Sequence, residues 1–438
     1  MPIMTERPLV NKTHFLAGLL SVVVALVLPA SARTQMTAYT GASVWDGTGA
    51  PVSTASLLVE DGVIRGIGPA LAIPPGATVV PLDGLFLMPG LVNTHGHVSG
   101  RWATNGASTE EDRIREDLLL YARYGVTTVN SLGDGTAALR IAGEPHAGSA
   151  HARLSASGAV VASPDPLGAR AQAAANAEGG AAWLKVRVDD NLGASDPMPW
   201  DAVEAVFEVG QETGVPVATH LFYLEDARRL LEMGTGMVAH SVRDAQVDAG
   251  FAEALAASGS CYVPTLTREV STFIYGSRPD FFDDPFFRRL ARPEEVARLD
   301  DPELQERFRR DPTAERYRRA LDQAMENLVI LQRAGVRIGF GTDSGPAGRF
   351  PGYFEHLELS LMVEAGLTST EALLSATGAA AECLGRDDIG TLQVGRTADF
   401  LVLGSDPTRD IDATRTLQRV FIGGVEVPMG GEAGSPQR

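Results

Sequence analysis

Residues 89–97 read PGLVNTHGH, an apolar segment that runs into two histidines separated by one glycine. Alternate residues of an extended strand project to the same face, so His95 and His97 can both point toward one metal ion. Gly96 leaves space between the two imidazoles. A His-x-His pattern is a weak signal by itself, and its meaning depends on what the rest of the chain places beside it.

Short apolar segments alternate with helical stretches through the middle of the chain, which is typical of parallel βα units. Amphipathic patterns such as 201–213 and 224–233 predict the helices. The predicted strands are 86–95, 125–132, 153–161, 182–188, 215–221, 237–242, 261–266 and 337–342. Eight such units predict an α/β fold, a (β/α)8 TIM barrel over residues 86–387. The alternative, a doubly wound open sheet, lacks a Gly-rich phosphate fingerprint after its first strand.

Both ends of the chain read as short strands with turns. Residues 36–84 and 391–427, within the terminal segments 33–85 and 388–438, show alternation of apolar and polar residues, and Asp61-Gly62 is a hairpin turn signal. We therefore predict a small β-sandwich domain formed by both chain termini. Within the barrel, the long connection 268–325 is rich in charge and phenylalanine. It predicts a helical insertion with an aromatic cluster at the barrel mouth, and a functional role and a solvated helical excursion are equally open.

Residues 1–32 have the three parts of a cleavable signal peptide. Arg7 and Lys12 precede the apolar run 15–28, and Ala30-Ser31-Ala32 supplies the small-residue cleavage pattern. The alternative, a membrane anchor, requires about 20 apolar residues. We expect a protein that is exported to the periplasm or secreted, with no stable membrane insertion after cleavage.

The formal net charge is −18. An acidic surface argues against nucleic acid as a partner and leaves a small-molecule substrate as the expectation. The chain has two cysteines, Cys261 and Cys383, far apart in sequence. An oxidising compartment would allow a disulfide, but two isolated cysteines favour buried apolar residues, so the pairing stays open.

Other strand ends carry the residues that metals bind. His220 and His240 each follow an apolar run, and Asp343 follows the last predicted strand. Each alone has a structural alternative, since single histidines often pack in cores and Asp343 could cap a helix. Lys185 lies inside an apolar strand, where an ammonium is rarely buried unpaired. A lysine that has reacted with CO₂ is an anionic carbamate and could bridge two cations. Together these residues predict a metal site.

This ligand order resembles that of the binuclear amidohydrolases, and the flanking motifs resemble the imidazolonepropionase-like and Xaa-Pro dipeptidase-like subgroup. The resemblance covers nearly the whole chain after the leader. The matching stretches are PGLVNTHGH (89–97), GVTTV (125–129), WLKV (183–186), VATH (217–220), AHS (239–241), GFGTDS (339–344) and GTLQVGRTADFLVL (390–403).

The resemblance implies a role for each residue. One ion would be held by His95, His97 and Asp343, and the other by His220 and His240. Lys185, carboxylated at N6, would bridge the two divalent ions, and the ligand types fit zinc. A hydroxide between the ions would be the nucleophile, with Asp343 as general base and acid.

Two further residues are candidate substrate contacts. Tyr223 could donate its hydroxyl to the substrate carbonyl, and Arg243 could pair with a substrate carboxylate, although each has a structural alternative. The sequence departs from the resemblance at 157–169, where relatives of the dipeptidase type carry a histidine and this chain has none.

The resulting hypothesis is metal-dependent hydrolysis of a C–N amide bond in a small molecule such as a dipeptide or an N-acyl amino acid. The alternative is an ester, lactone or cyclic amide cleaved by the same site. Lys185 argues against imidazolonepropionase chemistry and against a mononuclear deaminase, both of which lack this lysine in the family pattern. A non-enzymatic binding protein would be expected to have lost ligands. A homo-oligomer remains open.

Overall fold

The computed structural model describes residues 36–103 and 106–430. The predicted signal peptide at residues 1–32 lies outside these ranges, so the structure does not bear on it. Within the described ranges, no helix combines the length and the apolar character needed to cross a membrane.

The middle of the chain folds into two parallel sheets. One contains three strands in the order β6-β7-β8, and the other contains five in the order β13-β12-β11-β10-β9. All neighbours within each sheet are parallel. The strands are β6 (Leu91–Gly96), β7 (Val126–Gly133), β8 (Arg153–Ala159), β9 (Leu184–Arg187), β10 (Val217–His220), β11 (Met237–Ala239), β12 (Cys261–Val263) and β13 (Arg337–Ile338). Each overlaps one predicted segment, which confirms the strand order along the chain.

Single bridges join the two sheets at both edges. Val161 pairs with Val186 at one edge, and Gly96 pairs with Ser344 at the other. The fold is therefore α/β and TIM-barrel-like, but the expected continuous eight-stranded ladder is divided in two. At the second edge the division has a local cause, because β13 ends at Ile338 and only Ser344, beyond its end, is bridged to β6. A closed barrel in the strict sense stays a prediction.

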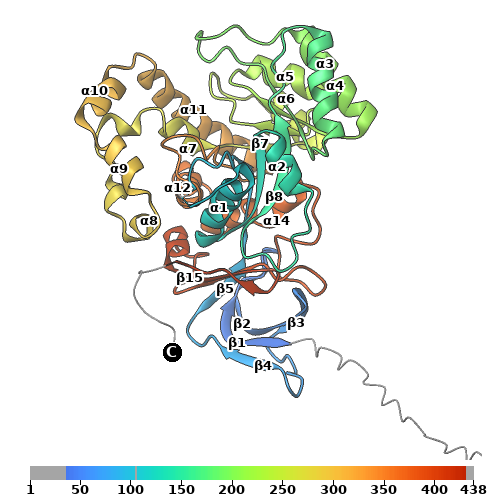
Figure 1. Ribbon diagram of the computed structural model, residues 1–438, viewed down its shortest axis with the longest axis vertical. Coiled ribbons are helices and arrows are strands. Elements are labelled where there is room, and N and C mark those ends of the chain that lie inside the picture. The colour runs from blue at the N-terminus through green and yellow to red at the C-terminus, as the bar shows by residue number, and fades with distance from the viewer. Residues whose placement is uncertain (1–35, 104–105, 431–438) are drawn as a thin grey trace, which may run out of the picture. The chain divides into compact units, whose positions relative to one another are not determined.

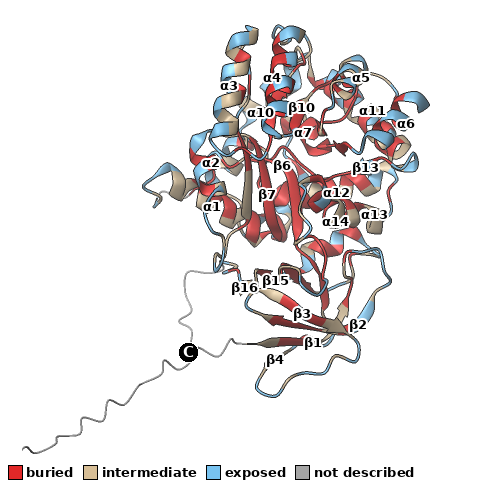
Figure 2. Cartoon of the chain, turned by 90° about the vertical axis from the view of Figure 1, so that its right-hand side faces the viewer, coloured by how far each residue is buried: buried red, intermediate tan, exposed pale blue. Residues whose placement is uncertain are grey.

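Helices connect consecutive strands, as parallel neighbours require. They are α1 (Glu110–Arg123), α2 (Thr136–Ala142), α3 (Pro166–Glu178), α4 (Trp200–Thr213), α5 (Leu224–Glu232) and α6 (Ala249–Ser258), with α12 (Tyr353–Ala365), α13 (Ser369–Ser375) and α14 (Gly378–Cys383) after β13. Capping side chains fix where several of these helices begin. At the start of α3, for example, the Asp165 side chain accepts a hydrogen bond from the amide of Gly168, and Pro166 lies in the first turn. In Figure 2, β6 and β7 are buried along their length while α3 and α4 carry exposed residues.

The connection between β12 and β13 is helical, as expected for the insertion. It contains α7 (Leu266–Val270), η1 (Ile274–Gly276), η2 (Asp280–Asp283), α8 (Pro285–Arg288), α9 (Pro293–Leu299), α10 (Pro302–Arg310) and α11 (Ala314–Arg333). Its aromatic residues pack on the loop and helix that follow β13. Ring centroids of Phe287 and Phe350 lie 4.8 Å apart, and those of Phe281 and Tyr353 lie 5.3 Å apart. This aromatic packing anchors the insertion to the barrel.

The two ends of the chain meet in one eight-stranded sheet, ordered β16-β15-β14-β5-β1-β2-β3 with β4 beside β1. Its strands are β1 (Thr37–Val44), β2 (Ser53–Glu60), β3 (Val63–Gly68), β4 (Thr78–Pro81), β5 (Phe86–Pro89), β14 (Phe400–Leu403), β15 (Leu417–Ile422) and β16 (Val425–Glu426). Figure 1 shows the blue and red strands side by side. The association of the termini is thus observed, whereas two packed sandwich layers stay a prediction.

The first expected strand, 86–95, is two strands. β5 belongs to the terminal sheet, where it pairs antiparallel with β14, and β6 belongs to the barrel. The chain changes sheets at Gly90, where a Cβ atom would collide with the side chain of Thr127. The apolar run FLMPGLV (86–92) continues across the break, so hydrophobic patterning did not divide the segment.

Cys261 and Cys383 form a disulfide, so the pairing that the sequence left open exists, and the favoured alternative of two isolated buried residues is wrong. Cys261 starts β12 and Cys383 ends α14, and their Cα atoms are 5.8 Å apart. The barrel brings the start of β12 beside α14 through packing that spacing in the sequence does not encode.

Candidate metal centre

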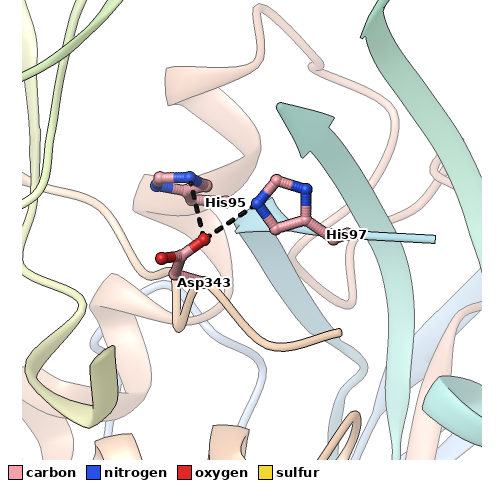
Figure 3. A group of neighbouring side chains, drawn as sticks. All are labelled: His95, His97 and Asp343. Atoms are coloured by element: carbon pink, nitrogen blue, oxygen red, sulfur yellow. Dashed lines mark hydrogen bonds and ion pairs between the residues drawn. The ribbon is translucent and has the colours of Figure 1, made fainter. Parts of the chain in front are cut away.

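His95, His97 and Asp343 form a compact group of potential metal ligands. One ligand atom from each lies within 4.8 Å of the others, and Figure 3 shows the three side chains converging. His97 Nε2 is 2.8 Å from Asp343 Oδ1, and His95 Nε2 is 3.6 Å from the same oxygen. The histidines come from the end of β6 and the aspartate from the segment after β13. The sequence-predicted association of these three residues is therefore present.

Backbone contacts between these two segments place the aspartate. The Asp343 amide donates to the carbonyl of His95 at 2.8 Å, while the His95 amide donates to Asn93 Oδ1 at 2.8 Å. Asp343 adopts the left-handed conformation, with φ of 56°. This conformation is costly for a non-glycine residue and is typical of functional sites. The Oδ2 oxygen of Asp343 is paired with Arg349.

His220 and His240 extend the group toward β10 and β11. The ring centroids of His220 and His240 are 4.1 Å apart, and those of His95 and His240 are 4.6 Å apart. His240 Nδ1 lies 2.7 Å from Thr265 Oγ1, and its φ of 103° is again unusual. The structure therefore brings all four predicted histidine ligands into one cluster.

Lys185 in β9 is buried, with 2% of its surface exposed, and its Nζ atom has no hydrogen-bond partner in the described part of the chain. Burial lowers the pKa of Lys185 to about 7. The His95 Nδ1 atom is likewise buried without a partner. Buried polar atoms are nearly always satisfied in proteins, so these two indicate a group that the protein side chains do not supply.

The ionisation of Asp343 and of three of the four histidines suits cation binding. Burial lowers the pKa of His220 to about 3 and that of His240 and His95 well below the usual value, so these imidazoles are neutral at pH 7. Burial opposes ionisation of Asp343, but Arg349 and His97 hold its pKa well below the usual value. Neutral imidazoles and a carboxylate are the forms that coordinate divalent metals. The donor set therefore fits zinc and similar ions.

Tyr223 and Arg243, the predicted substrate contacts, are engaged within the protein. The Tyr223 hydroxyl donates to Asp190 Oδ1 at 2.8 Å. Arg243 is buried, with its Nε atom 3.0 Å from Glu269 Oε1, and it donates from Nη1 to a backbone carbonyl at 2.6 Å. Its Nη2 atom has no partner among the described residues. Arg243 therefore forms a structural ion pair with Glu269, which was the alternative to a substrate contact. Only its Nη2 nitrogen is left without any of these contacts.

Three residues around the ligands were missed in the sequence. Asp134 Oδ2 lies 3.5 Å from His97 Nδ1, Thr265 contacts His240, and Arg349 pairs with Asp343. Burial lowers the pKa of His97, but Asp134 and Asp343 outweigh it and raise that pKa to about 9. Asp134 directly follows β7, so the strand-end rule applied to the second strand would have found it. Thr265 and Arg349 carry no such signal.

The sequence matches the Amidohydrolase family over residues 86–427. The chain belongs to the amidohydrolase family. The family and its named relatives support a hydrolase that acts on C–N bonds. The family generally uses divalent metals, in agreement with the His95, His97 and Asp343 group.

The amidohydrolase is similar to imidazolonepropionases over most of its length. It is 25% identical to that of Salinispora arenicola over 412 residues, which cover 83% of this chain and 89% of the relative. It is 26% identical to that of Deinococcus radiodurans over 402 residues, covering 86% and 92%. Both alignments extend beyond the barrel into the terminal strands.

Solved structures with a similar fold include dipeptidases. A candidate prolidase from Bifidobacterium longum superimposes with a TM-score of 0.73 at 24% identity, covering 92% of this chain and 96% of that one. A Xaa-Pro dipeptidase with bound methionine gives 0.71 at 20% identity, covering 90% and 99%. These similarities establish the fold. The family match and the two imidazolonepropionase alignments support the predicted superfamily and its imidazolonepropionase-like subgroup.

Proposed function

We propose that this amidohydrolase cleaves the amide bond of a small molecule such as a dipeptide or an N-acyl amino acid. The observation that carries the proposal is the convergence of four histidines, Asp343 and the buried Lys185 at the carboxyl ends of barrel strands. Catalytic groups in TIM-barrel enzymes are found at this face. The amide bond is the C–N bond common to the family and to the dipeptidase-type structures.

The ligands divide into two sets. His95, His97 and Asp343 would hold one divalent ion, and His220 and His240 would hold a second, with zinc the best match to imidazole and carboxylate donors. Two such ions supply a water of lowered pKa and a polarised scissile carbonyl.

Lys185 would act as a carbamate. With a pKa of about 7, a substantial fraction of its side chain is a neutral amine at physiological pH. The amine nitrogen can form a bond to the carbon of CO₂ and release one proton, which gives the anionic carbamate. This anion would replace an unsatisfied ammonium by two oxygen ligands, which accounts for a lysine buried beside cation ligands.

Asp343 would move the proton. Its carboxylate is ionised and faces the two β6 histidines, so it can accept a proton from the attacking water and deliver it to the leaving amine nitrogen. Tyr223 would donate a hydrogen bond to the carbonyl oxygen after turning from Asp190. Burial and Asp190 raise the pKa of Tyr223 to about 12, so its hydroxyl keeps its proton at pH 7. Arg243 would pair with a substrate carboxylate through Nη2.

A second candidate is hydrolysis of a cyclic amide by the same residues. It is favoured by the similarity to imidazolonepropionases over 83% and 86% of the chain, since their name denotes an imidazolone, itself a cyclic amide. Esters and lactones contain the same electrophilic carbonyl and belong to the same alternative.

We further propose that residues 1–32 direct export, a point that N-terminal sequencing of the protein purified from the periplasm or medium would decide.

The deciding experiment is a hydrolysis screen of the zinc-loaded full chain. Dipeptides, N-acyl amino acids, cyclic amides, esters and lactones are assayed side by side, with Asp343→Asn as the matched control. We expect turnover of a dipeptide or N-acyl amino acid that falls by at least about 100-fold in the control. Activity confined to cyclic amides or esters would transfer the proposal to the second candidate. Equal activity in Asp343→Asn would refute the role of Asp343.

A further inference from the structure

Helix α12 carries two fully buried glutamates, Glu355 and Glu358, on the side that faces the strand ends. They are three residues apart and therefore lie on one face of the helix. Neither belongs to the proposed set of ligands. Burying a carboxyl group is expensive unless it is hydrogen-bonded, so two of them beside a catalytic centre require an explanation.

Glu355 is bonded to the residues that flank the first set of ligands. Its Oε1 atom accepts from Asn93 Nδ2 at 2.6 Å, from Thr342 Oγ1 at 2.8 Å and from Ser344 Oγ at 2.7 Å. Thr342 and Ser344 enclose Asp343 in the sequence, and Asn93 Oδ1 accepts from the amide of His95. One carboxyl oxygen thus connects the β6 ligand segment to the segment that carries Asp343.

Glu358 is bonded to the segment that orients the second set. Its two carboxyl oxygens accept from the amides of Leu266 and Thr267, each at 2.7 Å. These amides directly follow Thr265, whose hydroxyl lies 2.7 Å from His240 Nδ1. The Thr267 hydroxyl lies 2.8 Å from Glu358 Oε2 and 3.0 Å from the carbonyl of Thr342, which connects the two halves.

We propose that Glu355 and Glu358 are positioning residues, each of which fixes one half of the metal centre. Glu355 holds the His95, His97 and Asp343 half through Asn93, Thr342 and Ser344. Glu358 holds the His240 half through Thr265. The inference rests on the proposed two-ion site. It implies that helix α12 sets the position of one ion relative to the other.

The test measures stepwise zinc affinities of the metal-free full chain by competition with a chromophoric chelator. Glu355→Leu should weaken binding of one ion by about 10- to 100-fold, and Glu358→Leu should weaken binding of the other, as expected when partners of metal ligands are lost. In a His240→Ala background only the first site remains, so there Glu355→Leu should still weaken binding and Glu358→Leu should not.

Two further variants separate positioning from stability. Glu355→Gln keeps an oxygen that can accept the three hydrogen bonds, because all three reach one oxygen, and it should restore the affinity that Glu355→Leu loses. Leu359→Ala, at another buried position of α12, should lower the melting temperature of the metal-free chain while leaving both affinities within twofold.

The connection from Glu358 through Thr265 to His240 can be tested separately. Thr265→Val removes the contact with His240 and should weaken the same ion as Glu358→Leu, with no further loss when both are combined. If a leucine variant does not fold, Asn93→Ala and Thr265→Val interrupt the same connections. A wild-type chain that binds fewer than two ions would overturn the two-ion site itself. Two ions bound with affinities unchanged in the variants would overturn only this inference.

Discussion

Lys185 is the residue whose chemistry depends most on its surroundings. Its Nζ atom is buried beside neutral imidazoles and an ionised aspartate, and it lacks a hydrogen-bond partner among the described residues. Lys185→Met keeps the apolar stem and removes the amine, so it should reduce bound zinc from two ions to one or none, and activity by at least about 100-fold. Elemental analysis of the dialysed protein measures the number of zinc ions bound per chain. Added acetate, a carboxylate of similar size to a carbamate, should restore part of the activity. Two ions in Lys185→Met would contradict a bridging role.

Asp117 is a second buried residue with a testable ionisation. It is fully buried, and burial raises its pKa from 3.8 to about 7 although the amides of Gly100 and Trp102 donate to it. Between about pH 4 and pH 7 the folded state therefore keeps a proton that the unfolded state has released. The contribution of Asp117 to stability is present below pH 4 and is lost as pH rises toward 7, with a slope of about 1.4 kcal/mol per pH unit.

Asp117→Asn should remove this slope. Urea unfolding of both proteins at half-unit steps between pH 4.5 and pH 8 measures the effect. The stability difference between wild type and Asp117→Asn should shrink as pH rises to 7 and stay constant above it. A difference independent of pH would mean that Asp117 is ionised in the folded protein throughout this range.

At the scale of elements, the positions of the strands and of the candidate ligands were predictable for one reason. A parallel strand places its last residues at one face of the barrel, so His95, His220 and Asp343 could be assigned from local sequence. The change of sheet at Gly90 could not be assigned in this way, because it depends on which strands pair before and after this residue. The residues that contact the candidate ligands or their flanking residues, such as Thr265 and Glu355, could not be predicted either. Their hydrogen bonds join segments that are remote in sequence, for example Glu355 and Asn93, which are 262 residues apart.

The disulfide between β12 and α14 is an element-scale connection that packing alone creates. Cys261 and Cys383 are 122 residues apart, so the bond restricts a long loop in the unfolded chain. Replacing both with serine should lower the free energy of unfolding by about 2 to 5 kcal/mol. The control is wild-type protein unfolded in the presence of a reductant, which should show the same loss. If the double variant and the oxidised wild type unfold at the same urea concentration, the disulfide does not stabilise the fold.

At the scale of the whole molecule, the terminal sheet and the barrel are joined by a largely buried ion pair. Arg153 opens β8 in the barrel, and Asp399 precedes β14 in the terminal sheet; their side chains are 12% and 2% exposed. The pair is bidentate, with Arg153 Nη2 donating to Asp399 Oδ1 at 3.0 Å. The same oxygen accepts from the Gly423 amide at 2.7 Å. One carboxylate therefore connects a barrel strand to the turn that closes the last hairpin.

Removing one member of this pair should cost more than removing both. Arg153→Met leaves Asp399 buried without its counter-charge and should lower the free energy of unfolding by about 3 kcal/mol, whereas the double variant Arg153→Met, Asp399→Leu should recover part of that loss. Urea unfolding of the two single variants, the double variant and wild type gives the coupling energy. Arg419→Met is the matched control, because Arg419 forms a bidentate pair with Glu426 that is 30% and 45% exposed and stays within the terminal sheet. That control should lose less than about 1 kcal/mol. Equal losses in Arg153→Met and Arg419→Met would show that burial at the junction adds nothing to the strength of the ion pair.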